Sequence, residues 1–316
     1  MYSKLNALIK KYEKIIIHRH SNPDGDALGS QFGMFHLINE NFENKKIFTV
    51  GDKSEFENNS IKSIFKEKFN NPKESDYKDA LVIVFDTANI DRIQGQNFFK
   101  GDTIVKIDHH VSTEEYADLE IIENTISSTC EIVTNMATEL KWKFTKKGAE
   151  YLMTGIITDT GRFMFNSVKE GTFHAAYTLA KEGVKMAKLV NLLNDRDINF
   201  TRFMAKVQTD FNFSKGVSSY IMPKELHKKY NVSYSQASSM VYALMSFKEA
   251  EYGVFFSYDE ELKLWKGSLR SKKKPINKIA EKYNGGGHEM ASGLKIKDKK
   301  QLNEVLKDLK KLAKKK

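Results

Sequence analysis

The chain has 316 residues, of which 40% are hydrophobic and 29% are charged. This length is about twice that of a common single domain, and the composition is that of a globular protein, so we expect two domains. No run approaches the roughly 20 apolar residues of a membrane-spanning helix, and the N-terminus lacks the apolar region of a signal peptide. Cys130 is the single cysteine. This excludes an intramolecular disulfide and a zinc site built from several cysteines, and it suits the reducing cytoplasm, where we expect the protein.

The net charge of +10 comes mainly from lysine, because only six of the 51 basic residues are arginine. Positive charge attracts phosphates over long distances. Lysine side chains that only face solvent give the same net positive charge, however. The charge alone therefore does not identify a nucleic-acid-binding protein.

Short apolar runs alternate with helical patterns in the first half of the chain. A helix from about Asp26 to Asn39 follows the first run and a Pro/Gly loop. The run 80–86 is uninterrupted, as is typical of a strand covered on both faces. Strands separated by helix-length segments imply right-handed βαβ units and a parallel sheet. The predicted strands are 14–18, 46–50, 80–86, 103–108 and, at an edge, 119–123.

The second half begins with a helical stretch from 127 to about 211, after which strand signals return. We therefore predict an α/β protein with a first domain over 1–190, in which helices cover both faces of the parallel sheet. A helical connector over 191–210 and a smaller mixed α/β domain over 211–316 follow. The elements predicted here are helices at 127–140, 146–158 and 235–246, strands at 216–222, 251–258, 261–270 and 294–297, and a closing lysine-rich helix.

Four short polar segments carry carboxylates and imidazoles, and three of them directly follow predicted strands. The carboxyl ends of parallel strands meet at one edge of the sheet, where ligands bind, so these side chains should converge there. Carboxylates with imidazoles and without thiolates suit Mn²⁺ or Mg²⁺. The candidate metal ligands are His20, Asp24, Asp26, Asp86, His109 and Asp159, with Asp108 and His110 beside them.

Four aspartates and two histidines are enough for two divalent ions that share one bridging carboxylate. Two ions roughly 3.5–4 Å apart can hold the attacking and the leaving oxygen of a phosphoryl transfer. They also lower the pKa of bound water, so that hydroxide forms near neutral pH and attacks phosphorus. The pattern therefore indicates metal-assisted chemistry on a phosphate ester.

Each segment taken alone also has a structural interpretation. The segment 24–26 could be a solvated turn, and Asp86 or Asp108 could cap a helix. An EF-hand loop starting at Asp24 is excluded, because Leu28 and Phe35 would occupy positions that need oxygen ligands. The segment Asp159-Thr160-Gly161 resembles the catalytic triplet of aspartic proteases, an interpretation that needs a second such segment or a symmetric dimer. The order and placement of the four segments together favour the metal site.

These four segments, in this order, resemble the DHH phosphoesterase superfamily, which is named for the Asp-His-His triplet found here at 108–110. The resemblance implies hydrolysis of phosphoesters or phosphoanhydrides with two divalent ions, usually Mn²⁺. It implies that His110 faces the substrate phosphate and that Asp108 orients the neighbouring imidazoles. The implied ligands are His20, Asp24 and Asp86 for one ion and Asp26, Asp86, His109 and Asp159 for the other.

The segment 284–293 resembles the glycine-rich signature of the DHHA1 domain, with Asn284 where a first glycine is common. Consecutive glycines expose backbone N–H groups, and the N-terminus of a following helix would favour an anion. Arginine suits bidentate contact with phosphate. The alternative interpretations are a flexible loop for the glycines 285–287 and a surface charge for Arg270. The resemblance implies an active site in the inter-domain cleft, with substrate bound by Arg270, Ser271, Gly286, Gly287 and His288.

Two such domains in a chain of this length resemble the stand-alone nano-RNase and pAp phosphatase type. The resemblance implies release of 5′-mononucleotides from very short RNA and removal of the 3′-phosphate of adenosine 3′,5′-bisphosphate (pAp). Phosphodiesterases acting on cyclic-di-AMP or its linear product pApA share this domain order and stay open. A non-catalytic nucleic-acid-binding protein and a pyrophosphatase are further alternatives. The resemblance also implies a homodimer through the first domain. Because no run is long and apolar enough to span a bilayer, we expect no membrane association.

Overall fold

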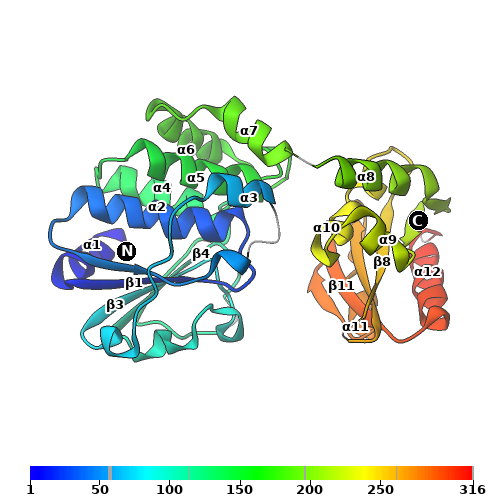
Figure 1. The fold of residues 1–316 in the computed structure, drawn as a ribbon, viewed down its shortest axis with the longest axis horizontal. Helices are drawn as coiled ribbons and strands as arrows, with labels where there is room; N and C mark the ends of the chain where they lie inside the picture. The colour runs from blue at the N-terminus through cyan, green and yellow to red at the C-terminus, as the bar shows by residue number, and fades with distance from the viewer. Residues whose placement is uncertain (56–58, 113, 196, 261, 315–316) are drawn as a thin grey trace. The chain divides into compact units, whose positions relative to one another are not determined.

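The computed structural model describes residues 1–55, 59–112, 114–195, 197–260 and 262–314. Glu261, the predicted first residue of one strand, and residue 196 of the predicted connector lie outside these ranges. The chain folds into two compact units, Met1–Asp195 and Arg196–Lys316 (Figure 1). Within the described ranges, no helix combines the length and the apolar character that crossing a bilayer demands.

A parallel sheet forms the centre of the N-terminal unit. Among the described residues it has five strands, in the order β2-β1-β3-β4-β5, and every neighbouring pair is parallel, as predicted. The third strand in the chain is apolar and buried throughout, and the fifth lies at an edge, both as expected. The strands are β1 (Lys14–Arg19), β2 (Lys46–Thr49), β3 (Ala80–Phe85), β4 (Thr103–Asp108) and β5 (Leu119–Ile122).

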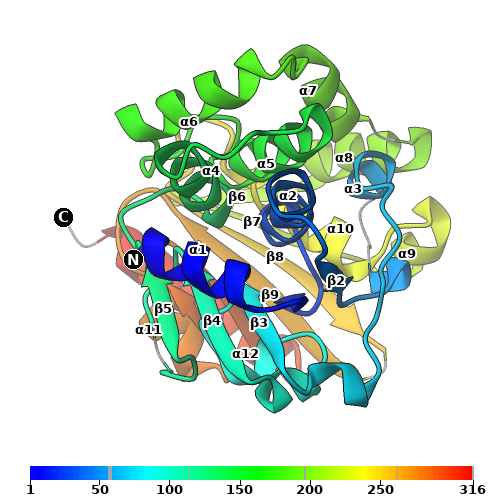
Figure 2. The same ribbon diagram turned by 90° about the vertical axis from the view of Figure 1, so that its left-hand side faces the viewer.

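Helices of two kinds cover the two faces of this sheet. Ile15 and Ile17 of β1 join a core with the α-helices, whereas Ile16 points to the other face and joins Tyr77 and Phe98 in or beside 3-10 helices. Figures 1 and 2 show α2, α4 and α5 together on one side of the sheet. The α-helices are α1 (Tyr2–Lys11), α2 (Gly25–Asn41), α3 (Asn59–Ile64), α4 (Thr129–Glu139), α5 (Lys146–Asp159), α6 (Glu170–Lys181) and α7 (Met186–Asn194), and the 3-10 helices are η1 (Lys53–Glu55), η2 (Glu74–Tyr77), η3 (Ile90–Arg92) and η4 (Gln96–Lys100).

Helix α2 begins at the acidic loop after β1. Asp24 caps the helix, and its Oδ1 accepts the backbone N–H groups of Asp26 at 3.0 Å and Ala27 at 3.1 Å, which satisfies two donors of the first turn. The helix packs closely on α5, because Gly29 has no side chain: a Cβ there would lie 2.6 Å from the carbonyl oxygen of Tyr151. This close packing fixes the acidic loop against α5.

The strand order places a topological switch point at the carboxyl ends of β1 and β3. The chain leaves β1 toward β2 on one side, while β3 lies on the other side of β1. Connections that depart in opposite directions leave room for a ligand between them. The loop after β1 carries His20, and the residue after β3 is Asp86.

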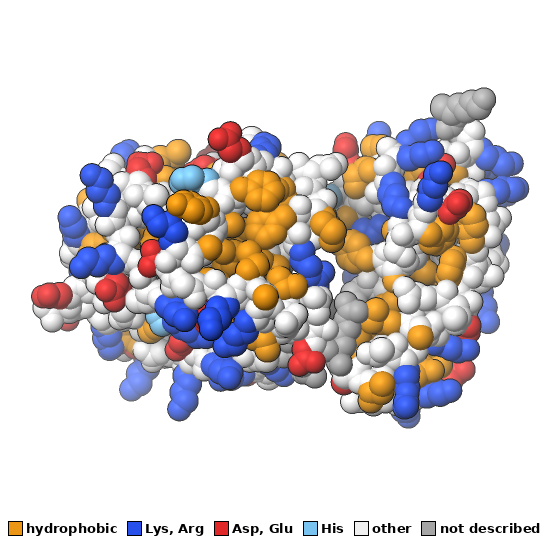
Figure 3. Space-filling view, turned by 90° about the horizontal axis from the view of Figure 1, so that it is seen from above, with side chains coloured by type: hydrophobic (Ala, Val, Ile, Leu, Met, Phe, Trp, Pro, Cys, Tyr) orange, Lys and Arg blue, Asp and Glu red, His pale blue; other side chains and the backbone are white. Residues whose placement is uncertain are grey.

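Large apolar side chains are exposed around α6 on the N-terminal unit. Met164, Phe165, Phe173 and Tyr177 are between 48% and 75% exposed. Figure 3 shows apolar side chains gathered on the face of this unit that it views. Contiguous exposed apolar surface of this kind often marks a contact with another protein.

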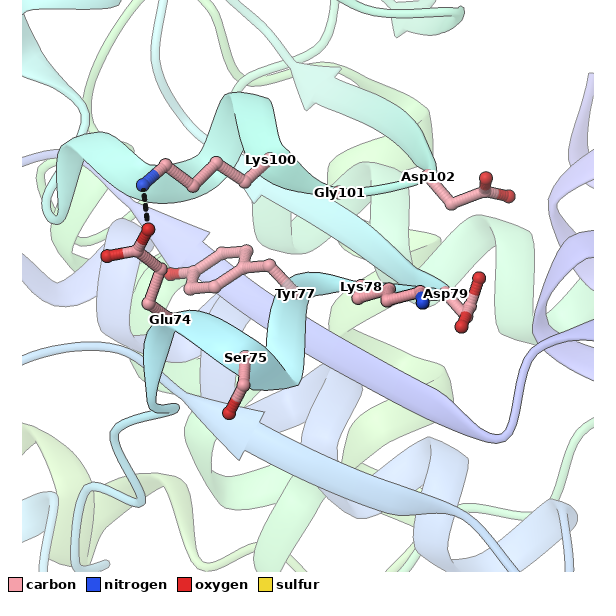
Figure 4. Close-up of a pocket in the computed structure, with 8 residues that line it drawn as sticks. All are labelled: Glu74, Ser75, Tyr77, Lys78, Asp79, Lys100, Gly101 and Asp102. Atoms are coloured by element: carbon pink, nitrogen blue, oxygen red, sulfur yellow. Dashed lines mark hydrogen bonds and ion pairs between the residues drawn. The ribbon is translucent and has the colours of Figure 1, made fainter.

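A hollow of about 630 Å³ lies at the opposite, amino ends of β3 and β4 (Figure 4). Glu74 and Lys100 form an ion pair of 2.6 Å at its border. It is formed by residues that precede the two strands, and it contains none of the predicted site residues. The predicted residues His20 and Asp86 lie instead at the carboxyl ends of β1 and β3.

A mixed sheet forms the centre of the C-terminal unit, with the strand order β10-β11-β9-β8-β7-β6. Among the described strands, β7 and β8 are parallel and the other pairs are antiparallel. The strands are β6 (Asn212–Ser214), β7 (Val217–Ile221), β8 (Tyr252–Asp259), β9 (Leu264–Ser271), β10 (Gly286–His288) and β11 (Ala291–Ile296).

The two faces of this second sheet carry separate cores. One core includes α11 (Asn277–Lys282) and α12 (Lys299–Lys314), and the other includes α8 (Ile198–Asp210), α9 (Glu225–Tyr230) and α10 (Tyr234–Ser238). The helix predicted over 235–246 is shorter than expected. After α10 the chain continues in the 3-10 helices η5 (Ser239–Val241) and η6 (Ala243–Met245).

The prediction of a helix after the glycine run is wrong. Gly286–His288 form strand β10, and the chain turns at Glu289 and Met290 and returns as the antiparallel strand β11. Buried and exposed residues alternate along β11, which is the period of a strand. Within the described residues, the element that directly follows the glycines is therefore a strand and not a helix N-terminus.

Candidate active site

The four polar segments meet at the carboxyl edge of the N-terminal sheet. His20 and Asp86 follow β1 and β3, Asp108 ends β4, and Asp159 ends α5. Three groups of side chains have potential ligand atoms within 4.8 Å of one another, so the fold brings all six predicted metal ligands together. These groups are His20, Asp24 and Asp86, then Asp26, His109 and Asp159, and finally Asp86, His109 and His110.

Asp86 lies between two histidines and presents one carboxylate oxygen to each. Its Oδ2 lies 3.5 Å from Nε2 of His20, and its Oδ1 lies 3.6 Å from Nε2 of His109. Its φ of 56° is in the left-handed region, which a residue other than glycine adopts only where its surroundings hold it. The hydroxyl of Thr129 donates to Oδ1 at 3.2 Å. The carboxylate of Asp86 can therefore contribute one oxygen to the group of ligands around His20 and the other to the group around His109.

The N-terminus of α4 holds Asp26, a contact that the sequence analysis missed. Oδ2 of Asp26 accepts the backbone N–H of Thr129 at 2.7 Å, and Oδ1 accepts that of Cys130 at 2.9 Å. The side chain of Ser128 caps the same helix by accepting the N–H of Glu131. The run 127–129 of small hydroxyl residues is a recognisable helix-start signal. Its contact with a carboxylate about one hundred positions earlier is not visible from that signal.

Asp24 and Asp159 lie at the rim of the cluster. The side chain of Asp24 is 57% exposed and that of Asp159 is 29% exposed, whereas Asp26 and Asp86 are buried. Nε2 of His109 lies 3.3 Å from Oδ2 of Asp159 and 3.9 Å from Oδ2 of Asp26. Solvent therefore reaches the cluster from the side of Asp24 and Asp159.

The crowded carboxylates shift one another's pKa. Burial and the charges of Asp86 and Asp24 hold the pKa of Asp26 well above its usual range. Burial and the charges of Asp26 and Asp86 raise the pKa of Asp159 to about 9. Burial disfavours the charged form of His20, but the neighbouring Asp24 and Asp86 outweigh it and raise the pKa of His20 to about 10.

The donor set of this cluster fits divalent cations. Within the part of the chain that the structure describes, no lysine or arginine is ion-paired with these four aspartates, and the basic side chains beside them are histidines. Oxygen and imidazole donors without thiolates are those that Mn²⁺ or Mg²⁺ accept. Bound cations would relieve the repulsion that raises the pKa values of Asp26 and Asp159.

Asp108 orients His110. Oδ1 of Asp108 accepts both the backbone N–H of His110 at 3.0 Å and its Nδ1–H at 2.8 Å. This hydrogen bond to the buried carboxylate raises the pKa of His110. With Nδ1 engaged, Nε2 is the ring nitrogen that is left for another partner.

Arg270 and His288 lie in one row across the second sheet. Arg270 on β9 pairs with Ala291 on β11, which pairs with His288 on β10, and paired residues point to the same face. The guanidinium of Arg270 lies 4.6 Å from the ring centroid of Tyr242, and its Nη1 donates to the carbonyl of Leu269 at 2.8 Å. Its buried Nε has no hydrogen-bond partner among the described residues.

The other predicted substrate-binding residues divide between the two faces. Gly286 lies two positions from His288 and shares its face, whereas Gly287 alternates to the opposite face. Ser271 also alternates away from Arg270, and its Oγ is occupied in a turn, where it donates to the carbonyl of Lys274 at 2.7 Å and accepts the N–H of Lys273 at 3.1 Å.

Comparison with known proteins agrees with this geometry. The profile of the DHH family N-terminal domain matches residues 14–156, and that of the DHHA1 domain matches residues 215–315. The bifunctional oligoribonuclease and PAP phosphatase NrnA of Bacillus subtilis (strain 168) is 34% identical over 319 residues, which cover 99% of each chain. The chain belongs to the DHH family. The resemblance indicated by its sequence motifs is thereby confirmed.

Two further comparisons bear on this DHH-family protein. The crystal structure of an exopolyphosphatase-related protein from Bacteroides fragilis shares its fold, with a TM-score of 0.89, 24% identity and coverage of 99% and 97% of the two chains. The cyclic-di-AMP phosphodiesterase GdpP of Geobacillus thermodenitrificans is 28% identical, but the match covers 63% of this chain and only 32% of that one.

Proposed function

We propose that this protein is a dimetal phosphoesterase that hydrolyses very short oligoribonucleotides to 5′-mononucleotides and removes the 3′-phosphate of pAp. The observation that carries the proposal is the position of Asp86, with one oxygen toward His20 and the other toward His109. The full-length similarity to a bifunctional oligoribonuclease and PAP phosphatase supports the class of substrate.

The two groups of side chains on either side of Asp86 would each hold one cation, for which we expect Mn²⁺. Mixed oxygen and nitrogen donors suit such a borderline ion. When bound, the cations would supply Lewis acidity and an activated water at the phosphorus. The first group is His20, Asp24 and Asp86, and the second is Asp26, His109 and Asp159 together with Asp86, whose Oδ1 faces His109.

Side chains of the protein supply the remaining functions. His110, whose pKa is raised by Asp108, would donate Nε2–H to the phosphate and stabilise developing negative charge. Asp108 keeps the imidazole in the required tautomer. In the C-terminal unit, Arg270 and His288 would hold a second phosphate, with the backbone of Gly286 and Gly287 beside them and Ser271 shaping the adjacent turn.

The test is a comparison of substrates with the wild-type protein and the Asp86→Asn variant in Mn²⁺. The substrates are pAp, a 5′-phosphorylated diribonucleotide, a 24-mer RNA, cyclic-di-AMP and pyrophosphate. We expect the wild type to hydrolyse pAp and the diribonucleotide, and the variant to lose about a thousandfold or more in rate. Asp91→Asn, at an exposed position, is the matched control.

Other outcomes would replace the proposal. Hydrolysis of cyclic-di-AMP alone would assign the protein to cyclic dinucleotides, and rapid hydrolysis of pyrophosphate alone would make it a pyrophosphatase. Tight, salt-sensitive binding of a 30-mer RNA without turnover of any substrate would indicate a non-catalytic binding protein. Turnover by Asp86→Asn at the wild-type rate would contradict the proposed metal site.

The exposed apolar side chains around α6 support a second copy of this chain as a partner. Phe173 and Phe163 stack with ring centroids 5.6 Å apart, so this surface is ordered by its own contacts. We expect the protein to sediment as a dimer and Phe173→Arg to sediment as a monomer. An unchanged dimer in that variant would place the interface elsewhere.

A further inference from the structure

Lys106 is a fully buried lysine that the proposed function does not use. It lies on β4, two positions before Asp108, so the two side chains point to the same face of the sheet. Its neighbour in register on β3 is Val84, which belongs to the apolar core of that face. Burying an ammonium group among apolar side chains is costly unless polar partners compensate. The polar partners of Lys106 therefore indicate why a charge is kept in this core.

The ammonium of Lys106 is held by residues that follow the Asp-His-His triplet. Its Nζ donates to Oγ of Ser112 at 3.2 Å and to the carbonyl oxygen of Glu114 at 3.3 Å, and it lies 4.7 Å from the centre of the Tyr116 ring. Glu120 is its neighbour in register on β5, yet Oε1 of Glu120 is buried without a hydrogen-bond partner among the described residues. The ammonium is therefore turned toward the chain that leaves the triplet and not toward the carboxylate beside it.

Two of these partners also hold the loop after β3. Oε2 of Glu114 accepts the backbone N–H of Ile90 at 2.7 Å, and the hydroxyl of Tyr116 donates to the carbonyl oxygen of Thr87 at 2.9 Å. Burial and the charges of nearby carboxylates raise the pKa of Tyr116, so its hydroxyl stays protonated and remains a donor. The network that begins at Lys106 therefore joins the loop after β4 to the loop after β3.

Both loops carry residues of the proposed metal site. Asp86 begins the loop after β3 in a left-handed conformation, with a φ of 56°, which its surroundings must hold. Thr87, the next residue, is buried, and Tyr116 binds its carbonyl oxygen. Across the site, Nε2 of His109 lies 3.6 Å and Nδ1 of His110 lies 3.4 Å from Oδ1 of Asp86. Movement of either loop would change these distances.

We propose that Lys106 is a positioning residue for the reaction, whose ammonium ties the loop of His110 to the loop of Asp86. It acts on the site through the residues that it holds. An apolar side chain of similar length would fill the same space without the cost of burying a charge, so the charge is kept for the geometry of the site. The reaction that Lys106 supports is that of the proposed function, on which this inference rests.

The test compares Lys106→Met with Lys45→Met, a matched control, in the full chain. Lys45 also binds two oxygen atoms, the carbonyls of Lys10 at 3.0 Å and Tyr12 at 2.7 Å, but it precedes β2, at the edge of the sheet opposite the site. We expect kcat for pAp in Mn²⁺ to fall about tenfold to a hundredfold in Lys106→Met, with KM within about twofold, because the reacting groups are misplaced. Lys45→Met should keep both values.

Two further measurements do not depend on turnover. The dissociation constant of Mn²⁺ should rise about tenfold in Lys106→Met and stay unchanged in Lys45→Met. Hydrogen exchange at the backbone N–H of Ile90, which Glu114 binds, should become faster in Lys106→Met alone.

Conservative substitutions separate positioning from folding. Lys106→Arg keeps a charged donor and should restore kcat to within about fivefold of the wild-type value. Tyr116→Phe keeps the ring beside the ammonium and removes the hydroxyl that binds Thr87, so it should lower kcat about threefold or more without a change in KM. This second variant decides the question if Lys106→Met does not fold.

A wild-type kcat in Lys106→Met or in Tyr116→Phe would overturn the proposal. Equal effects of Lys106→Met and Lys45→Met would do so too, because the loss would then follow from any missing lysine contact. If Lys106→Arg does not restore kcat, the proposal also falls, since Lys106 would then act by its shape and not by its charge.

The two proposals fail in different ways. If Lys106→Met weakens Mn²⁺ and speeds exchange at Ile90, but the wild type hydrolyses no substrate, the network stands around a metal site of another activity and the proposed function falls. If the wild type hydrolyses pAp and short RNA while Lys106→Met keeps the wild-type kcat and the wild-type exchange, the positioning role alone falls.

Discussion

His110 donates two hydrogen bonds to one oxygen of Asp108, from its backbone N–H at 3.0 Å and from its Nδ1–H at 2.8 Å. The two contacts close a tight turn directly after β4. They fix both the position and the tautomer of the imidazole beside Asp86, whose Oδ1 lies 3.4 Å from the same Nδ1. The chemistry of His110 therefore depends on a residue that is itself buried.

Replacing Asp108 by asparagine tests this dependence. The amide oxygen still accepts the two hydrogen bonds, but the charge that raises the pKa of His110 is lost. Because less of the imidazole is protonated at neutral pH, we expect kcat for a diribonucleotide to fall about a hundredfold, with a smaller change in KM. The pH at which kcat is highest should move down.

Asp118→Asn is the matched control, since Oδ2 of Asp118 also accepts a backbone N–H, that of Ile104 at 2.8 Å, outside the site. It should leave kcat unchanged. A wild-type pH profile in Asp108→Asn would show that the carboxylate does not act through His110.

Gly155 on α5 allows this helix to pack closely against α2 and α4 beside the site. The substitution Gly155→Ala should push these helices apart. A Cβ there would lie 2.2 Å from Sγ of Cys130 and 2.9 Å from Oδ1 of Asp26. We expect a loss of about 1–3 kcal/mol in the free energy of unfolding and weaker binding of Mn²⁺, because Asp26 must move. Urea unfolding checks the first effect and metal titration the second.

Gly171→Ala provides the comparison, because the nearest atom to its Cβ is the end of the Glu131 side chain, at 3.3 Å. It should change stability by less than about 1 kcal/mol. Equal losses of stability in the two variants would show that close helix packing at Gly155 is not the cause.

Cation binding should stabilise the N-terminal unit, and Asp86→Asn should remove most of that effect. A cation present at about 100 times its dissociation constant adds about 2.7 kcal/mol to the free energy of unfolding. Thermal unfolding with Mn²⁺, Mg²⁺ or Co²⁺, and again after chelation, measures it. The same stabilisation in Asp86→Asn would mean that the cations bind elsewhere.

His18 should make the metal-free protein sensitive to acid. Burial, together with the charge of Arg19, lowers the pKa of His18 to about 4, despite the hydrogen bond of Nδ1 to the carbonyl of Gln94. In the unfolded chain the pKa is about 6.5, so below that pH the unfolded state binds more protons and stability falls. Between pH 7 and pH 5 the titration of His18 should lower the free energy of unfolding by about 2 kcal/mol.

The measurement compares this loss with that of His18→Asn, in which the amide replaces Nδ1 as donor and cannot titrate. Trp265→Phe in both proteins leaves Trp142, in the core of the N-terminal unit, as the single tryptophan reporter. Above pH 7 the free energies of unfolding of the two proteins should differ by a constant amount. Parallel curves down to pH 5 would show that His18 does not titrate on unfolding.

Local patterns in the sequence determined much of this protein. The uninterrupted apolar run predicted β3, because a strand covered on both faces has no polar side. The polar residues after β1, β3 and β4 predicted a shared site, because parallel strands end at one edge. Five of the six ligand candidates follow from this reasoning and from their donor chemistry, whereas Asp159 ends helix α5.

Tertiary structure alone decided the rest. The contact of Asp26 with the N-terminus of α4 joins segments about one hundred residues apart, and no local signal names the partner. The glycine run becomes strand β10 because β11 is there to pair with it, although glycine by itself is unfavourable in a strand. The same pairing sets Arg270, Gly286 and His288 on one face and turns Ser271 away. Short-range sequence patterns reflect the energies of local backbone conformations, whereas strand pairing and helix packing depend on surfaces that exist only in the folded chain.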